Sequence, residues 1–156
     1  MFSDKSALGE RVFLSADVAR LAGVSLRQLQ WWDERKVISP RKDDHRRLYV
    51  PEQVLEILTV AALRRKGLSL QKIRKVLRLL RREIGQLGSN VWSTKSKLYL
   101  ITDGNSIRVD DQPGSVLNRL ADATKPMHLV CLTDQVERIM SEKAPRRYRT
   151  KQLQLF

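Results

Sequence analysis

The chain of 156 residues contains one cysteine and no long apolar run. Because Cys131 is alone, neither a disulfide nor a cysteine metal cluster can form within one chain. No apolar segment approaches the roughly 20 residues that a membrane-spanning helix needs. The start of the chain, MFSDKSALGERVFL, contains acidic residues and lacks the apolar core of a signal peptide. These absences favour a cytoplasmic protein without a membrane partner.

The common signatures of catalysis are also missing. The sequence has no glycine-rich phosphate loop, no motif with paired catalytic carboxylates, and no HxxxH or CxxC pattern. His45 and His128 are isolated, and we expect the first at the surface and the second on the outward side of a strand. Cys131 stands in an apolar run and is expected to be buried. We therefore expect no enzyme, no cofactor and no metal site.

Positive charge is plentiful and unevenly distributed along the chain. Residues 1–90 carry 19 Lys and Arg against 10 Asp and Glu, whereas residues 91–142 carry 6 against 7. Residues 143–156 carry 5 and no acid. A basic first part, a nearly neutral middle and a basic tail indicate a polyanionic partner, although a basic surface kept for solubility is the alternative.

A helix-turn-helix pattern organises the first part of the chain. The apolar residues Val18, Leu21 and Val24 have helical spacing, and Ala22-Gly23 gives a tight turn. A strand is expected over Val12–Leu14, with Ser15 as the cap of the first helix. Ser25 is expected to cap the second helix, which runs to about Arg35 with Leu26, Leu29 and Trp32 as its apolar positions. In such a motif the second helix enters the DNA major groove.

A basic hairpin and two further helices follow this motif. Pro40 ends the second helix, and a wing is expected with Arg41, Lys42, Arg46 and Arg47 around an Asp43-Asp44 tip. Pro51 starts a third helix that ends near Lys66-Gly67, and Ser69 caps a fourth. The fourth helix has an apolar side formed by Leu70, Ile73, Val76, Leu77, Leu80 and Ile84. Its other side contacts phosphate or is simply solvated, and carries Lys72, Arg74, Lys75, Arg78, Arg81 and Arg82.

A second unit is expected after a linker at residues 85–91, which Gly85 and Gly88 mark. LYLIT and SIRV alternate around Asp103-Gly104 and predict a hairpin. Three further elements complete this second unit. They are a helix that begins at Pro113 and has Val116, Leu117 and Leu120 as apolar positions, a buried strand in MHLVCL, and a helix capped by Thr133. The expected fold class is α+β, a winged helix-turn-helix followed by a small α/β domain. The predicted divisions are 1–11 flexible, 12–84 DNA-binding, 85–91 linker, 92–142 α/β domain and 143–156 basic tail.

Residues 12–84 resemble the winged helix-turn-helix domain of the MerR family of bacterial transcription regulators. The matching pieces are VARLAGVSLRQL, WWD, VISP, RRLY and LRRKGLSLQKIRKVL. The resemblance implies a sequence-specific regulator that binds a pseudo-palindromic operator in double-stranded DNA as a homodimer and distorts it. It also makes RNA polymerase a candidate partner. The unit at 92–142 resembles that of a less-studied two-domain subgroup, and dimerisation or signal sensing is its expected role.

The sequence departs from the common family pattern at several places. Gln30 stands where an arginine is usual, Trp31-Trp32 replaces two tyrosines, and Arg46 replaces a tyrosine of the wing. Base preference and phosphate geometry are therefore expected to differ from the common pattern. Gly85 and Gly88 also shorten the long helix through which members of the family dimerise.

The expected DNA contacts centre on the second helix. Arg27 suits bidentate contact with guanine and Gln28 with adenine, although a phosphate contact is an equal alternative for Arg27. Trp31 is expected to pack on sugar and bind phosphate, whereas Trp32 is expected in the core. Tyr49 contacts DNA or packs internally. The whole expected DNA-binding set is Ser25, Arg27, Gln28, Gln30, Trp31, Arg46, Arg47, Tyr49 and Lys66.

The last five residues, QLQLF, resemble the short peptide by which bacterial polymerases and repair proteins bind the sliding clamp. The corresponding positions here are Gln152, Leu153, Leu155 and Phe156, and such a peptide places its spaced apolar side chains in a preformed groove. The alternative is a tail that packs on its own chain. The second functional hypothesis is therefore a DNA-bound adaptor that recruits replication or repair machinery.

Overall fold

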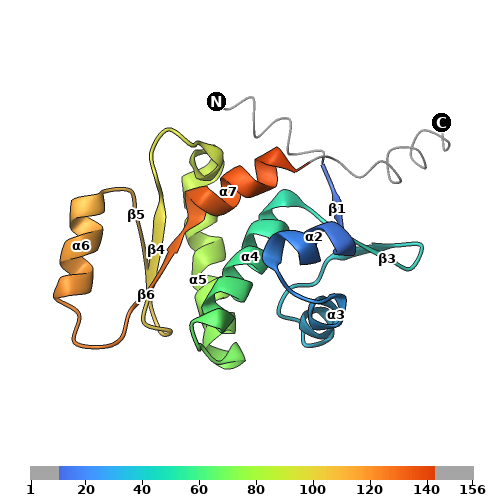
Figure 1. Cartoon of the computed structure of the whole chain (residues 1–156), viewed down its shortest axis with the longest axis horizontal. Coiled ribbons are helices and arrows are strands. Elements are labelled where there is room, and N and C mark those ends of the chain that lie inside the picture. Colours follow the sequence, from blue (N-terminus) through green and yellow to red (C-terminus); the bar gives the residue numbers. More distant parts are fainter. Residues whose placement is uncertain (1–10, 143–156) are drawn as a thin grey trace.

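The computed structural model describes residues 11–142, and every structural statement below concerns that range. Within it, six α-helices and two three-stranded antiparallel sheets follow one another (Figure 1). The elements from β1 to α5 form the N-terminal part, and those from the short 3₁₀ helix η1 to α7 form the C-terminal part. The predicted α+β class and the winged helix-turn-helix are confirmed.

The helix-turn-helix consists of α2 (Ser15–Ala22) and α3 (Leu26–Glu34). Gly23 turns the chain between them at φ 69°, a left-handed conformation that favours glycine. Ser25 caps α3 as predicted, because its Oγ accepts a hydrogen bond from the Gln28 N–H at 3.0 Å. The prediction that Ser15 caps α2 is wrong. The helix already begins at Ser15, and the Asp17 carboxylate accepts the Leu14 N–H at 3.3 Å instead.

The wing is a hairpin in a small sheet with the order β1-β3-β2. Its strands are β1 (Phe13–Leu14), β2 (Arg41–Asp43) and β3 (Arg46–Tyr49). Asp44 and His45 form the tip with φ values of 53° and 70°, as a two-residue hairpin turn requires. The predicted wing is therefore present, but its turn lies at Asp44-His45, because Asp43, predicted at the tip, still pairs with Arg46 in the hairpin.

Two long helices carry the core of the molecule. Pro51 opens α4 (Pro51–Arg65), and Ser69 caps α5 (Leu70–Leu87) by accepting the Lys72 N–H at 3.3 Å, both as predicted. The sequence predicts an apolar stripe of Val54, Leu55, Leu58 and Ala61-Ala62 on this helix, but buried residues occur on most of the circumference of α4. The reason is that α2, α5 and α7 all pack against α4.

The predicted linker at 85–91 is not an open connection. Helix α5 continues through Gly85 to Leu87, and η1 (Gly88–Trp92) follows immediately. Val91 and Trp92 are buried where η1 lies against α5 and α7. A glycine in a helix costs only about 1 kcal/mol relative to alanine, and burying an indole can outweigh that cost.

The C-terminal part is a second sheet with helices on both faces. Its strands are β4 (Tyr99–Thr102), β5 (Ile107–Asp110) and β6 (His128–Cys131), in the order β5-β4-β6. Its helices are α6 (Pro113–Ala121) and α7 (Leu132–Ser141). The predicted hairpin and the predicted order of elements are confirmed.

Individual side chains of this part differ from expectation. Thr133 does not cap α7 with its hydroxyl; its Oγ1 accepts the Leu98 N–H at 2.7 Å and so holds the start of β4. Leu117, predicted on the apolar side of α6, is 67 % exposed, and Cys131 is only partly buried. Leu26 of α3 is likewise exposed rather than buried. Leu26 and Leu117 lie on the outward sides of α3 and α6, where little covers them.

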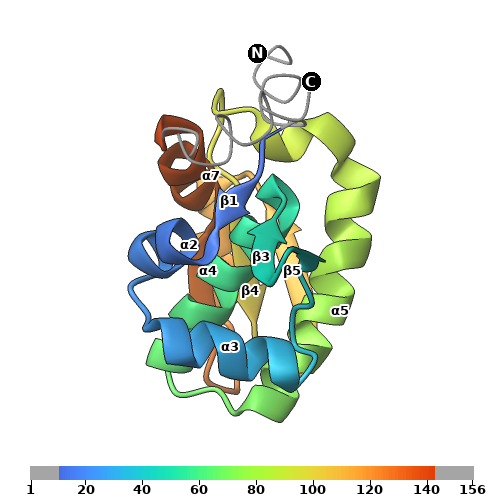
Figure 2. The ribbon, with the colours of Figure 1, turned by 90° about the vertical axis from the view of Figure 1, so that its right-hand side faces the viewer.

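The two parts share one hydrophobic core. Buried residues from Phe13 to Ile139 form one cluster, with α4 between the helix-turn-helix and α7. Inside this contact, the Thr59 hydroxyl lies 3.0 Å from the side-chain oxygen of Gln135. Figures 1 and 2 show the sheet of the C-terminal part behind α4 and α5, on the side away from α3 and the wing. The linker predicted at residues 85–91 separates the two parts in sequence, but the two parts are not separated in space because they share this core.

Candidate nucleic-acid interface

Helix α3 presents its hydrophilic face at the surface (Figure 2). Arg27 is exposed, and Gln28 is half-buried beside Arg64 and Arg65 at the end of α4. Ser25 is exposed but holds the helix cap, so its hydroxyl is already occupied by the helix end. The N-terminal half of α3 therefore offers one amide and one guanidinium that has no ion pair within residues 11–142.

The two tryptophans of α3 have different roles. Trp32 is completely buried, as predicted. Trp31 is 39 % exposed, and the Arg35 guanidinium lies 5.1 Å from the centroid of its ring. This cation–π contact fixes the exposed indole at the surface. Gln30 is less free than its sequence position indicates, because its amide donates to Glu34 at 3.0 Å.

A buried carboxylate fixes the wing to α3. Asp33 is 8 % exposed and accepts a hydrogen bond from the Nε of Arg47 at 2.6 Å. The Nζ of Lys42 lies 3.5 Å from the same carboxylate oxygen. Arg47 was predicted as a DNA contact, but its guanidinium is engaged with Asp33 and positions the wing. The acid in WWD and the basic wing were both visible in the sequence, whereas their pairing was not.

The wing residues separate into exposed and internal ones. Arg46 is partly exposed and is still available for a backbone contact. Tyr49 is 1 % exposed, so its predicted contact with DNA is wrong and the packing alternative is correct. The cause is that Tyr49 pairs with Phe13 in the middle of the small sheet, and its burial raises the pKa of the phenol.

Two of the six cations predicted on α5 bind other elements of the N-terminal part. Arg81 pairs with Glu56 at 2.7 Å and donates to the Val37 carbonyl at 3.1 Å. Arg74 donates to the carbonyl of Arg35, at the end of α3. Among the described residues, the other cations of α5 have no ion pair, and those on its outward side are Lys75, Arg78 and Arg82.

The end of α4 lies beside the turn of the helix-turn-helix. Arg65 donates to the Ala22 carbonyl at 3.1 Å, which holds these two elements together. Lys66 follows directly as the exposed C-cap of α4. The structure therefore places Lys66 near α3, although the two are 30 or more residues apart in sequence.

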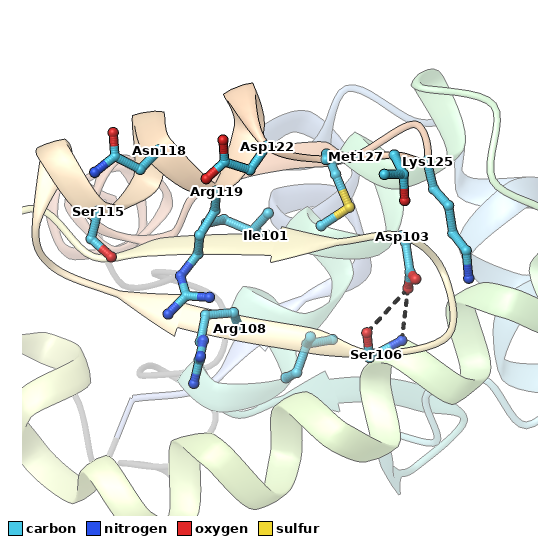
Figure 3. Close-up of a pocket in the computed structure, with 13 residues that line it drawn as sticks. Ile101, Asp103, Ser106, Arg108, Ser115, Asn118, Arg119, Asp122, Lys125 and Met127 are labelled. Carbon is cyan, nitrogen blue, oxygen red and sulfur yellow. Dashed lines mark hydrogen bonds between the residues drawn. The ribbon is translucent and has the colours of Figure 1, made fainter.

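A pocket of about 930 Å³ lies between α6 and the sheet of the C-terminal part (Figure 3). Ile101 and Met127 give it an apolar floor, and the cations Arg108 and Arg119 lie at its rim. Arg119 is 3.7 Å from Asp110, whose pKa is lowered first by a hydrogen bond from Ser115. Within residues 11–142 no group of three or more His, Cys, Asp or Glu side chains is arranged to hold a metal ion.

These features define a winged helix-turn-helix protein whose recognition helix, wing and supporting helices are locked together by ion pairs. Residues 13–80 match the family model described as MerR HTH family regulatory protein, so this region belongs to the MerR family. Regulators of this type bind DNA and control transcription, and they are not enzymes. A comparison with curated proteins found no match to the chain. No helix in the described range is both long and apolar enough to cross a membrane.

Proposed function

We propose that the protein is a sequence-specific MerR-type transcription regulator that binds a pseudo-palindromic operator as a homodimer. The observation that carries this proposal is the exposed N-terminal half of α3, with Arg27 unpaired beside a wing held by Asp33. An arginine can bind guanine O6 and N7 together, and a glutamine can bind adenine N6 and N7. Arg27 and Gln28 are therefore the proposed base-reading pair, while a phosphate contact by Arg27 is still open.

The outward face of α5 is poorly suited to pairing two copies of the chain. The apolar side of α5 is already buried in its own core, and its outward side carries Lys75, Arg78 and Arg82. Pairing two copies there would place like charges together without apolar burial. We therefore assign dimerisation to the C-terminal part. The pocket beneath α6 supports signal sensing as a further role of the same part.

The experiment that tests the proposal is selection of duplexes from a random library by the purified full-length protein. We expect a motif with two-fold symmetry, and we expect Arg27→Ala to lose preference at one position in each half-site. Each lost bidentate base contact should reduce discrimination at that position by about 1–3 kcal/mol. Arg78→Ala on α5 is the matched control, because it removes the same group from an unpaired outward position.

Three results would contradict this proposal. Equal affinity for all duplexes would exclude a sequence-specific regulator. A motif without symmetry would exclude the homodimer on the operator, and an unchanged motif in Arg27→Ala would exclude Arg27 from base reading.

The adaptor hypothesis depends on Gln152, Leu153, Leu155 and Phe156, which lie outside the described residues. It stays a prediction from the sequence. The regulator hypothesis is better supported than the adaptor hypothesis. The arrangement of α3, the wing and α4 is that of a winged helix-turn-helix, and the family match covers all three.

A further inference from the structure

Three lysines from separate elements surround one hollow at the junction of the two parts. Lys66 is the C-cap of α4, Lys72 stands in the first turn of α5, and Lys125 belongs to the loop between α6 and β6. The hollow has a volume of about 580 Å³. Its lining also includes Asp103 and His128 of the C-terminal part. Elements that are distant in sequence thus place three ammonium groups around one open space.

The tip of the β4–β5 hairpin lies against Lys72 at the start of α5. Gly104 has a φ of 94°, and a Cβ at this position would lie 2.9 Å from the Cδ of Lys72, so the tip rests on the side chain of α5. The Thr102 hydroxyl accepts the Gly104 N–H at 2.9 Å and donates to the Ser106 carbonyl at 2.7 Å. The turn is therefore stabilised by its own hydrogen bonds and packs against the start of α5.

The one acid at the hollow, Asp103, offsets only part of the lysine charge. The Asp103 carboxylate accepts the N–H groups of Asn105 and Ser106 at 2.8 and 2.9 Å, and these bonds lower its pKa. Within residues 11–142 none of the three lysine ammonium groups has an ion pair. Figure 3 shows the Lys125 side chain extending past Asp103, away from Arg119 and the α6 side of the pocket. Three lysines against one aspartate leave this surface positive.

The cluster continues the positive surface of the DNA-reading part. Arg64 and Arg65 line a small hollow with Gln28 of α3, and Lys66 follows them at the end of α4. Figures 1 and 2 both show the turn between α4 and α5 beside α3. A basic surface thus runs from the N-terminal half of α3, along the end of α4, to the loop that carries Lys125.

We propose that Lys66, Lys72 and Lys125 form a phosphate-binding cluster for the backbone of duplex DNA, outside the bases that α3 reads. The C-terminal part then takes a direct share in DNA binding. This inference rests on the proposed function, since it needs the protein to bind duplex DNA. An ammonium group on a flexible chain binds phosphate as a point charge and reads no base. The cluster adds affinity and salt dependence, and leaves the preferred sequence unchanged.

The test compares Lys125→Gln with Lys95→Gln in the full-length protein. Lys95 is exposed and has no ion pair within residues 11–142, and its loop before β4 lies at the opposite end of the molecule from the α4–α5 turn (Figure 1). Affinity for the selected operator and for an unrelated duplex is measured by fluorescence polarisation between 50 and 200 mM salt. Both duplexes test the cluster because a phosphate contact does not depend on sequence.

One lost phosphate contact should make the slope of log affinity against log salt less steep by about 0.9. Raising the salt fourfold weakens binding by the unaltered protein and by Lys125→Gln. The fold loss of affinity should be about 3.5 times smaller for Lys125→Gln. The change should be equal on both duplexes, and Lys95→Gln should retain the original slope. Lys125→Arg retains the charge and should retain the slope as well.

The possible contrary results distinguish a failure of the phosphate-binding cluster from a failure of the proposed function. The cluster is refuted if the slope of log affinity against log salt is the same for Lys125→Gln and Lys95→Gln. It is also refuted if Lys125→Gln changes the preferred DNA motif but leaves this slope unchanged. A loss in Lys125→Arg as large as in Lys125→Gln overturns it too, because the charge is then not the cause. If the unaltered protein binds no duplex, the proposed function itself fails.

Discussion

Replacing Asp33 with Asn tests whether one carboxylate holds the wing against the recognition helix. The amide keeps the shape of the side chain and removes only its charge, which faces Arg47 at 2.6 Å and Lys42 at 3.5 Å. Breaking a fully buried ion pair costs about 3–5 kcal/mol. Here the Arg47 and Lys42 side chains are 25 % and 61 % exposed, so water recovers part of that cost. We expect a loss of about 1.5 kcal/mol in the free energy of unfolding.

For a chain of this size, that loss lowers the Tm by about 3–6 °C, which calorimetry can resolve. Asp43→Asn in the exposed wing is the matched control and should leave the Tm unchanged. Operator affinity should also fall in Asp33→Asn, because the wing loses its fixed position relative to α3. The reasoning is refuted if the two variants unfold at the same temperature.

Two glycines that differ in backbone conformation give opposite predictions, measured by urea unfolding. Gly104→Ala should lose at least about 1 kcal/mol, because the left-handed backbone disfavours a Cβ that also meets Lys72. Gly85→Ala, in a helical position with open space, should gain about 0.5–1 kcal/mol, and equal effects would contradict both assignments. The pKa of Asp103 is below its ordinary 3.8 because two backbone N–H groups bind the carboxylate. Its contribution to stability is therefore complete above pH 3.8 and is lost as the pH falls through the lower folded pKa. In Asp103→Asn the urea midpoint should therefore fall less as the pH is lowered. The same fall as in the unaltered protein would show that the Asp103 carboxylate does not stabilise the turn.

The features predicted correctly from the sequence are local ones. Ser25 and Ser69 cap helices three residues before their partners, and Pro51 opens α4. The tips at Asp44 and Gly104 follow from turn chemistry within four residues. Such signals need only neighbouring residues, so the order of elements from β1 to α7 could be predicted without knowing what each element packs against.

The features that were missed depend on contacts between distant residues. Arg47 meets Asp33 across 14 positions, Arg81 meets Glu56 across 25, and Arg74 reaches the end of α3 across 39. From the sequence, Arg47 was predicted to contact DNA, and Arg74 and Arg81 were predicted either to contact phosphate or to be solvated. Tyr49 became internal because β1 covers it, and Gly85 stayed helical because the elements around it pack together. In all these cases packing decides between two roles that the residue type allows equally.

The shared core has a consequence for how such a chain is inherited. Helix α7, from the end of the described range, supplies Val136 and Ile139 to the core around α4, and its Arg138 donates to the Leu21 carbonyl of α2. The N-terminal part does not close its own interior. A recombination event that exchanged the C-terminal part would have to bring a matching face for α4 with it. The two parts are therefore expected to diverge together, as one unit of descent rather than as interchangeable modules.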